Sequence, residues 1–204
     1  MRKPVVFIDD DELERRSCFD VLCEIFADTS IAIEPSAPLP TLADYSSIIA
    51  NNAVAGLIID EHLNTAGGVN YSGVELAAHL RSIGGNLPIV ILTNYPDDDF
   101  AQKGWAVENI FSKRDVIFDP NSPVALAFKA RLSRLIEIAG IAMGEREKRY
   151  HELLVKFART NLNDGEKAEL EALEADRIAP VTAAEKEKQQ QLDKEIATLK
   201  RLLG

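Results

Sequence analysis

Four short, largely apolar runs, each followed by a polar residue, constrain the fold of this chain more than any other feature. Short runs rich in Val, Ile and Leu are typical of strands that are buried on both faces of a parallel sheet. Side chains at the carboxyl ends of such strands converge on one crevice. The runs are residues 5–8, followed by Asp9 and Asp10; residues 56–59, followed by Asp60; residues 89–92, followed by Thr93; and a fourth that ends at Lys113.

Segments with helical periodicity alternate with these runs. This alternation predicts an α/β fold, a doubly wound five-stranded parallel sheet with helices on both faces. Proline-rich residues 35–40 are predicted to form a stiff loop. The predicted strands are 4–8, 31–33, 55–60, 88–93 and 109–113. The predicted helices are 12–27, 74–83 and 98–108. Two more helices are predicted, one capped by Thr41 or Asp44 and a last one that begins at Ser122-Pro123.

The last helix is predicted to continue past the sheet into a C-terminal helical extension. Its apolar positions advance in steps of four and three, the period of a coiled coil, so the helix can extend to about residue 160. Gly140 and Gly144 are poor helix formers, and a break near 144 is the alternative. The stripe consists of Leu132, Ile136, Ala139, Met143, Arg146, Tyr150, Leu153 and Phe157.

Two short charged helices, separated at Pro180, are predicted beyond residue 160. Asn163 with Glu166, and Thr182 with Glu185, have the spacing of capping boxes. This tail has too little apolar surface for a core of its own and must pack on something else. The predicted organisation is therefore a domain at residues 1–144 and a helical extension at residues 145–204, as a coiled coil or a helical hairpin.

Charge and composition exclude several classes of function. The net charge of −10 divides into −9 for residues 1–144 and −1 for residues 145–204, which argues against DNA binding and against a basic membrane-surface helix. No apolar stretch approaches the roughly 20 residues that span a bilayer, and no signal-peptide core follows Met1, so we expect a cytoplasmic protein. Cys18 and Cys23 are expected to lie on the core face of the first helix.

The polar residues at the strand ends suit phosphoryl chemistry. Asp9, Asp10 and Asp60 make an oxygen-only acidic site of the kind that binds Mg²⁺. With the metal bound, the carboxylate of Asp60 can attack a phosphoryl donor. Lys113 can neutralise charge on the transferring group, and Thr93 can donate a hydrogen bond to a phosphoryl oxygen.

Residues 4 to about 140 resemble the receiver domain of two-component response regulators, which has a flavodoxin-like fold. The resemblance rests on the acidic pair Asp9-Asp10 and on Asp60, Thr93 and Lys113, which occur in the family's order after successive strands. It implies that Asp10 ligates Mg²⁺ directly and Asp9 largely through water, and that Asp60 is both a ligand and the phosphorylation site. It also implies that the backbone carbonyl of His62 completes the metal shell, that Thr93 is the switch hydroxyl, and that Lys113 pairs with the phosphate.

The chain departs from the family pattern at three places. Arg114 stands where proline usually follows the lysine, and Ile110 occupies the position of the aromatic switch, with Phe111 beside it facing the opposite side of the sheet. The loop after Asp60 is longer than usual and can cover the site or dock a partner.

Three other interpretations remain open from the sequence. The acids at residues 9–11 can simply cap the first helix. A haloacid-dehalogenase-like phosphatase would use Asp9 and Asp11 with Thr93 and Lys113, but it leaves Asp60 unexplained, and Leu13 does not fit its motif. A pseudo-receiver would bind a partner through its helical tail without being phosphorylated.

The resemblance implies a receiver that takes a phosphoryl group from a histidine kinase or a phosphotransfer protein and is not an enzyme acting on a separate substrate. Its state would be passed to a downstream protein effector, with no nucleic acid or membrane partner. The apolar stripes of the C-terminal helices also suggest a possible homodimer.

Overall fold

The centre of the molecule is a parallel β-sheet. In a computed structural model, which describes residues 3–50, 53–83, 87–94 and 109–203, the strands follow the order β2-β1-β3-β4-β5, and every described pairing is parallel. This is the flavodoxin-like order and confirms the predicted α/β fold. The strands are β1 (Val5–Ile8), β2 (Ile33–Ser36), β3 (Gly56–Asp60), β4 (Ile89–Thr93) and β5 (Ile110–Ser112).

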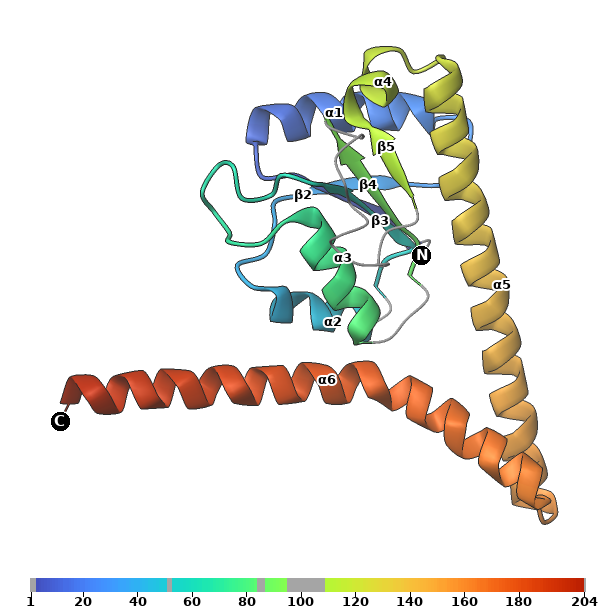
Figure 1. Cartoon of the computed structure of the whole chain (residues 1–204). Helices are drawn as coiled ribbons and strands as arrows, with labels where there is room; N and C mark the ends of the chain where they lie inside the picture. The colour runs from blue at the N-terminus through green and yellow to red at the C-terminus, as the bar shows by residue number, and fades with distance from the viewer. Residues whose placement is uncertain (1–2, 51–52, 84–86, 95–108, 204) are drawn as a thin grey trace.

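Helices cover both faces of the sheet (Figure 1). On one face, helices α1 (Glu12–Ile25) and α4 (Lys113–Phe118) and the first part of α5 (Pro123–Arg159) contribute to one apolar cluster. On the other face, the 3₁₀ segment η1 (Leu42–Tyr45), α2 (Ser46–Ala50) and α3 (Gly73–Ser82) contribute to a second cluster. Every residue of β3 and β4 is buried, as expected for strands with helices on both sides.

Side-chain caps define where several helices begin. The Ser122 hydroxyl accepts a hydrogen bond from the Ala125 N–H and Pro123 follows it, so the predicted start of α5 is confirmed. Ser72 and Glu75 form a capping box at the start of α3.

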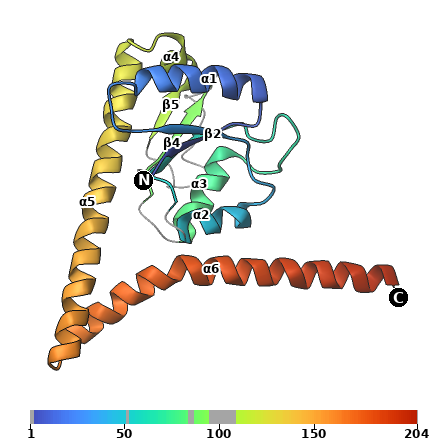
Figure 2. The ribbon, with the colours of Figure 1, turned by 180° about the vertical axis from the view of Figure 1, so that it is seen from behind.

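The C-terminal part of α5 and helix α6 (Asp164–Leu203) form the C-terminal extension. Helix α5 is continuous through Gly140 and Gly144, so the structure has no helix break near residue 144. The chain then reverses, and α6 runs beside α2 and η1 before its C-terminal part extends past the sheet (Figures 1 and 2). The Asn163–Glu166 capping box, predicted from the sequence, lies at this reversal.

Ion pairs join the two long helices near their turn. Arg149 binds both carboxylate oxygens of Glu169, at 2.9 Å and 2.6 Å, and Lys156 pairs with Glu166. Leu153 and Leu162 are buried at this end of the extension. Bidentate arginine–carboxylate contacts fix geometry as well as charge, so this part of the extension is a defined helical hairpin.

Two predictions about these elements are wrong. Strand β2 begins at Ile33 and includes Pro35, whereas the sequence suggested a strand at 31–33 and then a loop; β2 has a neighbour on one side only, and an edge strand tolerates proline. Helix α6 runs through Pro180 without interruption, so no new helix begins at Thr182.

Three smaller differences concern β5, α1 and the segment before β5. Strand β5 ends at Ser112, and Lys113 opens α4, a helix the sequence did not predict. Cys18 is buried as expected, but Cys23 is exposed. The helix predicted at 98–108 lies outside the described residues. In the part of the chain that the structure describes, no helix is long and apolar enough to cross a membrane.

Gly73 is required by the close approach of α3 to the end of β3. A Cβ atom at this position would lie 2.3 Å from the backbone oxygen of Asp60. We expect Gly73→Ala to lower the free energy of unfolding by at least about 2 kcal/mol because backbone atoms must move apart. Urea denaturation measures this loss.

Gly68→Ala is the matched control, because a Cβ there meets no atom within 4 Å. It should change the free energy of unfolding by no more than about 0.5 kcal/mol. Equal stability of the two variants would contradict the described approach of α3 to β3.

Candidate functional site

The ammonium group of Lys113 connects three carboxylates at the carboxyl edge of the sheet. Its Nζ lies 2.7 Å from Oδ2 of Asp9, 2.9 Å from Oδ1 of Asp60 and 2.6 Å from Oε2 of Glu14. Asp9 follows β1, Asp60 ends β3, Lys113 follows β5 and Glu14 belongs to α1. Residues far apart in the chain therefore meet at one charged centre.

Strand register explains why these groups meet. Ile8, which precedes Asp9, is paired with Ile59, which precedes Asp60. Asp60 is in turn aligned with Leu92, the neighbour of Thr93, and Thr93 is aligned with Ser112 in β5. Parallel strands in register carry the residues after their last apolar positions to the same edge.

The centre is removed from water. Asp9, Asp60, Thr93 and Lys113 are all buried, with relative exposures of 1%, 6%, 0% and 5%. Buried charges require partners, and three carboxylates around one ammonium leave an excess of negative charge. The site is thus suited to a further cation or to a group that relieves this excess.

Burial and charge shift two pKa values at the centre. Burial raises the pKa of Asp9, although the hydrogen bond and charge of Lys113 act in the opposite direction. Burial alone would lower the pKa of Lys113, but the charge of Asp60 and the hydrogen bonds to Asp9, Glu14 and Asp60 outweigh it and raise the pKa. Lys113 is therefore a permanent cation at physiological pH.

Backbone groups orient the two buried acids. The His62 N–H donates to Oδ2 of Asp60 at 2.9 Å, and the Asp11 N–H donates to Oδ1 of Asp9 at 3.0 Å. Each carboxylate thus has one oxygen on Lys113 and the other on a backbone N–H, which fixes its plane.

Asp10 lies at the same edge but faces the loop between β3 and α3. Its Oδ2 accepts a hydrogen bond from the Ala66 N–H at 2.6 Å. The long loop therefore reaches over to the acidic pair, in keeping with the expectation that it can cover the site. Lys113 makes its described ion pairs with Asp9, Glu14 and Asp60, not with Asp10.

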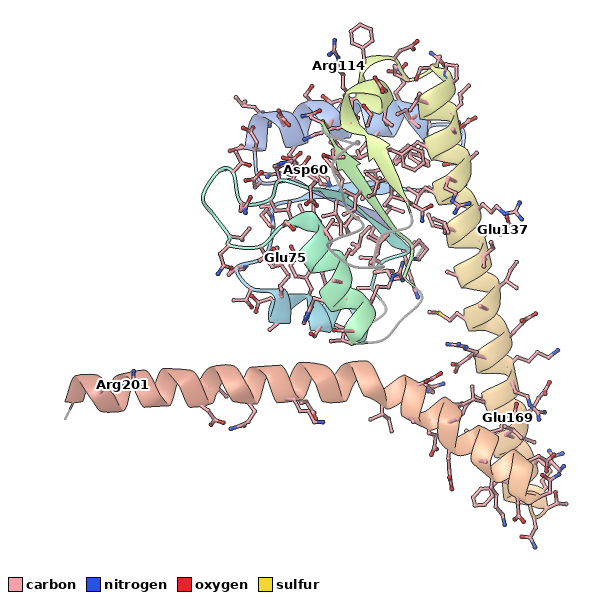
Figure 3. The ribbon with its side chains drawn as sticks, in the orientation of Figure 1. Asp60, Glu75, Arg114, Glu137, Glu169 and Arg201 are labelled. Carbon is pink, nitrogen blue, oxygen red and sulfur yellow. The ribbon has the colours of Figure 1, made fainter. Side chains whose placement is uncertain are left out.

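The start of α3 holds the other side of the site. The Glu61 carboxylate is buried and accepts a hydrogen bond from the Val74 N–H at 2.8 Å. The Gly73 N–H donates to the Glu61 backbone oxygen at 2.9 Å. These bonds tie Asp60 and its neighbour to the N-terminus of α3, and Figure 3 shows Asp60 between α1 and α3.

The donor set is chemically suited to Mg²⁺, the metal that the family resemblance implies. Asp9, Asp10 and Asp60 offer carboxylate oxygens next to excess negative charge, and hard dications prefer such ligands. In the described residues, no group of three acidic, histidine or cysteine side chains is arranged to hold an ion. Lys113 binds one oxygen each of Asp9 and Asp60, and the Ala66 N–H binds one oxygen of Asp10, so an ion would compete with these contacts.

The structure brings most of the predicted site residues together. Asp9, Asp60 and Lys113 are in direct contact, Thr93 is buried at the adjacent strand end, and the His62 backbone is bonded to Asp60. Among the three consecutive acids, Asp11 is the one that caps α1, accepting hydrogen bonds from the N–H groups of Leu13 and Glu14.

Three residues of the site were missed by the sequence reasoning. Glu14 was not recognised because its contact with Lys113 spans 99 residues of chain. Glu61 and Gly73 carried a weak signal, an acid directly after the strand-end aspartate and a glycine at the start of the next helix.

Two of the three departures from the receiver pattern, at Ile110 and Arg114, lie away from this centre. Phe111 packs against Phe128 of α5, with ring centroids 5.4 Å apart. Ile110 belongs to the cluster on the opposite face of the sheet, as the alternation of strand residues predicted. Figure 3 shows Arg114 at the outer end of the molecule, directed away from Asp60.

Neither the models of known protein families nor the sequences of curated proteins give a significant match to this chain. The interpretation of the site therefore depends on its own geometry and chemistry.

Replacement of Lys113 by methionine tests whether its ammonium group holds the acids together. We expect the free energy of unfolding in metal-free buffer to fall by about 3–5 kcal/mol at pH 8, because buried carboxylates lose their counter-charge. The loss should be smaller at pH 5. Without the ammonium the pKa of Asp9, already raised by burial, rises further, so Asp9 takes up a proton as the pH falls.

Lysine titration cannot produce this pH dependence in the wild type. A raised lysine pKa gives stabilisation that is complete below the ordinary value, about 10.4, and is lost only at higher pH. The exposed Lys148 provides the control Lys148→Met, which should change stability by no more than about 0.5 kcal/mol. A Lys113→Met loss that is equal at pH 5 and pH 8 would contradict the described charge centre.

Proposed function

We propose that this protein is a receiver that accepts a phosphoryl group on Asp60 and passes its state to other proteins. The observation that carries the proposal is the ammonium of Lys113 bonded to both Asp9 and Asp60 at the carboxyl edge of a parallel sheet. Thr93, buried at the next strand end, adds a hydroxyl to the same edge. This set combines a carboxylate nucleophile with the groups needed to neutralise phosphoryl oxygens.

In the proposed reaction, a carboxylate oxygen of Asp60 forms a bond to the phosphorus of the donor. The bond from phosphorus to the donor breaks, and its electron pair leaves with the donor, which is a histidine nitrogen or the acetate oxygen of acetyl phosphate. The negative charge that Asp60 loses appears on the leaving group, as acetate or as a histidine nitrogen that takes up a proton, and the phosphoryl oxygens keep the charge they had in the donor. Lys113 and Thr93 would donate hydrogen bonds to those oxygens.

Mg²⁺ is part of the proposal. Asp9, Asp10 and Asp60, with the His62 backbone carbonyl, would hold it, and when bound it supplies positive charge beside the phosphoryl oxygens. Asp10 would then exchange its hydrogen bond to the Ala66 N–H for the metal, which would link occupancy of the site to the long loop.

The partners follow from this chemistry. A histidine kinase or a phosphotransfer protein would supply the phosphoryl group, and a downstream protein effector would read the state, in the cytoplasm. The acidic charge of residues 1–144 favours neither nucleic acid nor membrane as a partner. On this proposal the protein is not an enzyme with a separate substrate.

The two alternatives receive less support. A phosphatase of the haloacid dehalogenase type needs Asp11 as a second catalytic acid, yet the Asp11 carboxylate caps α1. A pseudo-receiver does not explain why Asp9, Asp60 and Lys113 are assembled in a buried centre, since an unmodified binding module has no need of buried charges.

Intact-protein mass spectrometry after incubation with acetyl phosphate and Mg²⁺ tests the proposal. We expect the mass of one added phosphoryl group, and we expect it to disappear in Asp60→Asn because the amide is not a nucleophile. It should also disappear when EDTA removes the metal.

Asp20→Asn is the matched control, since it makes the same chemical change at an exposed position of α1 and should be modified like the wild type. A wild-type chain that gains no phosphoryl group would overturn the proposal. Modification of Asp9 with rapid release of phosphate would instead favour the phosphatase.

The extension is proposed to form a homodimer. Ile178 and Leu192 of α6 are exposed, at 56% and 45%, and the C-terminal part of α6 extends away from the sheet (Figure 2). We expect light scattering to give a dimer for the full chain and a monomer for Leu192→Glu, because a buried charge opposes association. The variant Ala172→Glu adds the same charge at an exposed position of the same helix, on the opposite side from Leu192, and should stay dimeric. A monomeric wild type would contradict this part of the proposal.

A further inference from the structure

We propose that Glu14 is a latch that holds Lys113 in the unphosphorylated protein and releases it when Asp60 receives a phosphoryl group. This inference rests on the proposed phosphoacceptor function. It assigns a positioning role to a residue of α1 that acts on the reaction only through Lys113.

The ammonium of Lys113 has no donor to spare. A lysine ammonium has three N–H groups, and Nζ has three carboxylate acceptors, in Asp9, Glu14 and Asp60, at 2.7, 2.6 and 2.9 Å. The group is also almost entirely removed from solvent. A hydrogen bond from Lys113 to an incoming phosphoryl oxygen therefore requires that one existing bond be given up.

The three carboxylate acceptors of Lys113 differ in how easily they can be given up. The side chain of Asp9 is 1% exposed and that of Asp60 is 9% exposed, whereas that of Glu14 is 54% exposed. Until the phosphoryl group is transferred, Asp9 and Asp60 are both buried carboxylates, and leaving either of them without its counter-charge is strongly unfavourable. A half-exposed carboxylate can exchange the ammonium for water at little cost, so Glu14 is the acceptor that Lys113 releases most easily.

Glu14 is directed at Lys113 by a fixed backbone. The Glu14 N–H donates to the Asp11 cap at 2.9 Å, and Glu14 lies in the first turn of α1. The contact is the shortest of the three made by Nζ. The contact with Glu14 therefore holds the Lys113 ammonium toward α1. When this contact breaks, the ammonium can donate a hydrogen bond to the phosphoryl group on Asp60.

The latch predicts a gain of function when Glu14 is neutralised. We expect Glu14→Gln to increase the rate of phosphorylation by acetyl phosphate roughly two- to fivefold, because removal of a half-exposed ion pair frees Lys113. The affinity for beryllofluoride with Mg²⁺ should rise by a similar factor. A damaged fold only slows the reaction, so an increase is not explained by a purely structural role.

Two further variants separate the contact from the charge. Glu12→Gln removes the same charge from the same helical turn, where Glu12 is not a described partner of Lys113, and should react like the wild type. Glu14→Asp keeps the charge but shortens the side chain by one methylene, so its carboxylate no longer reaches Nζ. On the latch account Glu14→Asp is accelerated like Glu14→Gln.

The outcomes distinguish this inference from the function on which it rests. Rates for Glu14→Gln that match or fall below those of the wild type, while the wild type is modified on Asp60, would overturn the latch alone. Acceleration of Glu14→Gln with an unchanged Glu14→Asp would also overturn it, since charge without contact would then suffice. A wild-type protein that takes up no phosphoryl group would contradict both the proposed function and the proposed role of Glu14.

Discussion

The ammonium of Lys113 joins two strand ends and a helix, and the arrangement of the site depends on it. Asp9 and Asp60 are buried at the ends of adjacent strands, β1 and β3, where their charges would repel each other without a cation between them. The same ammonium reaches Glu14 and so ties α1 to the sheet. An interaction that holds the resting structure together is therefore also the one that the proposed chemistry must rearrange.

The surrounding structure serves this centre by restricting the acids. The backbone N–H groups of Asp11 and His62 donate hydrogen bonds to the carboxylate oxygens of Asp9 and Asp60 that do not contact Lys113. Gly73 allows α3 to approach the end of β3 within a distance that no side chain permits. Since Asp10 is bonded to the loop at Ala66, a change in ligation at the acidic pair is transmitted directly to that loop. The rigid sheet thus presents fixed groups, and Asp10 and Glu14 are the two acids with freedom to exchange partners.

The sequence predicted what depends on local pattern and missed what depends on tertiary contact. The sheet, the caps at Ser122 and Asn163 and the convergence of Asp9, Asp60 and Lys113 follow from buried strand runs and short-range hydrogen bonds. The predicted loop at Pro35 and the predicted helix break at Pro180 are wrong, because an edge strand and a long helix accommodate prolines that local rules treat as breaks. Neither the Glu14 contact nor the close approach at Gly73 is encoded in residue spacing. Both arise only when distant segments pack together.

The most direct test of the account is a two-dimensional amide NMR titration of the full chain with Mg²⁺ and beryllofluoride. The account predicts saturable shifts centred on the amides of Asp11, His62 and Ala66, which donate to Asp9, Asp60 and Asp10. The amides beside the Arg149–Glu169 ion pair in the extension should not shift directly, and Asp60→Asn should abolish the site shifts. Shifts absent from these three amides, or centred on the extension, would contradict a single phosphoryl-binding centre at the carboxyl edge of the sheet.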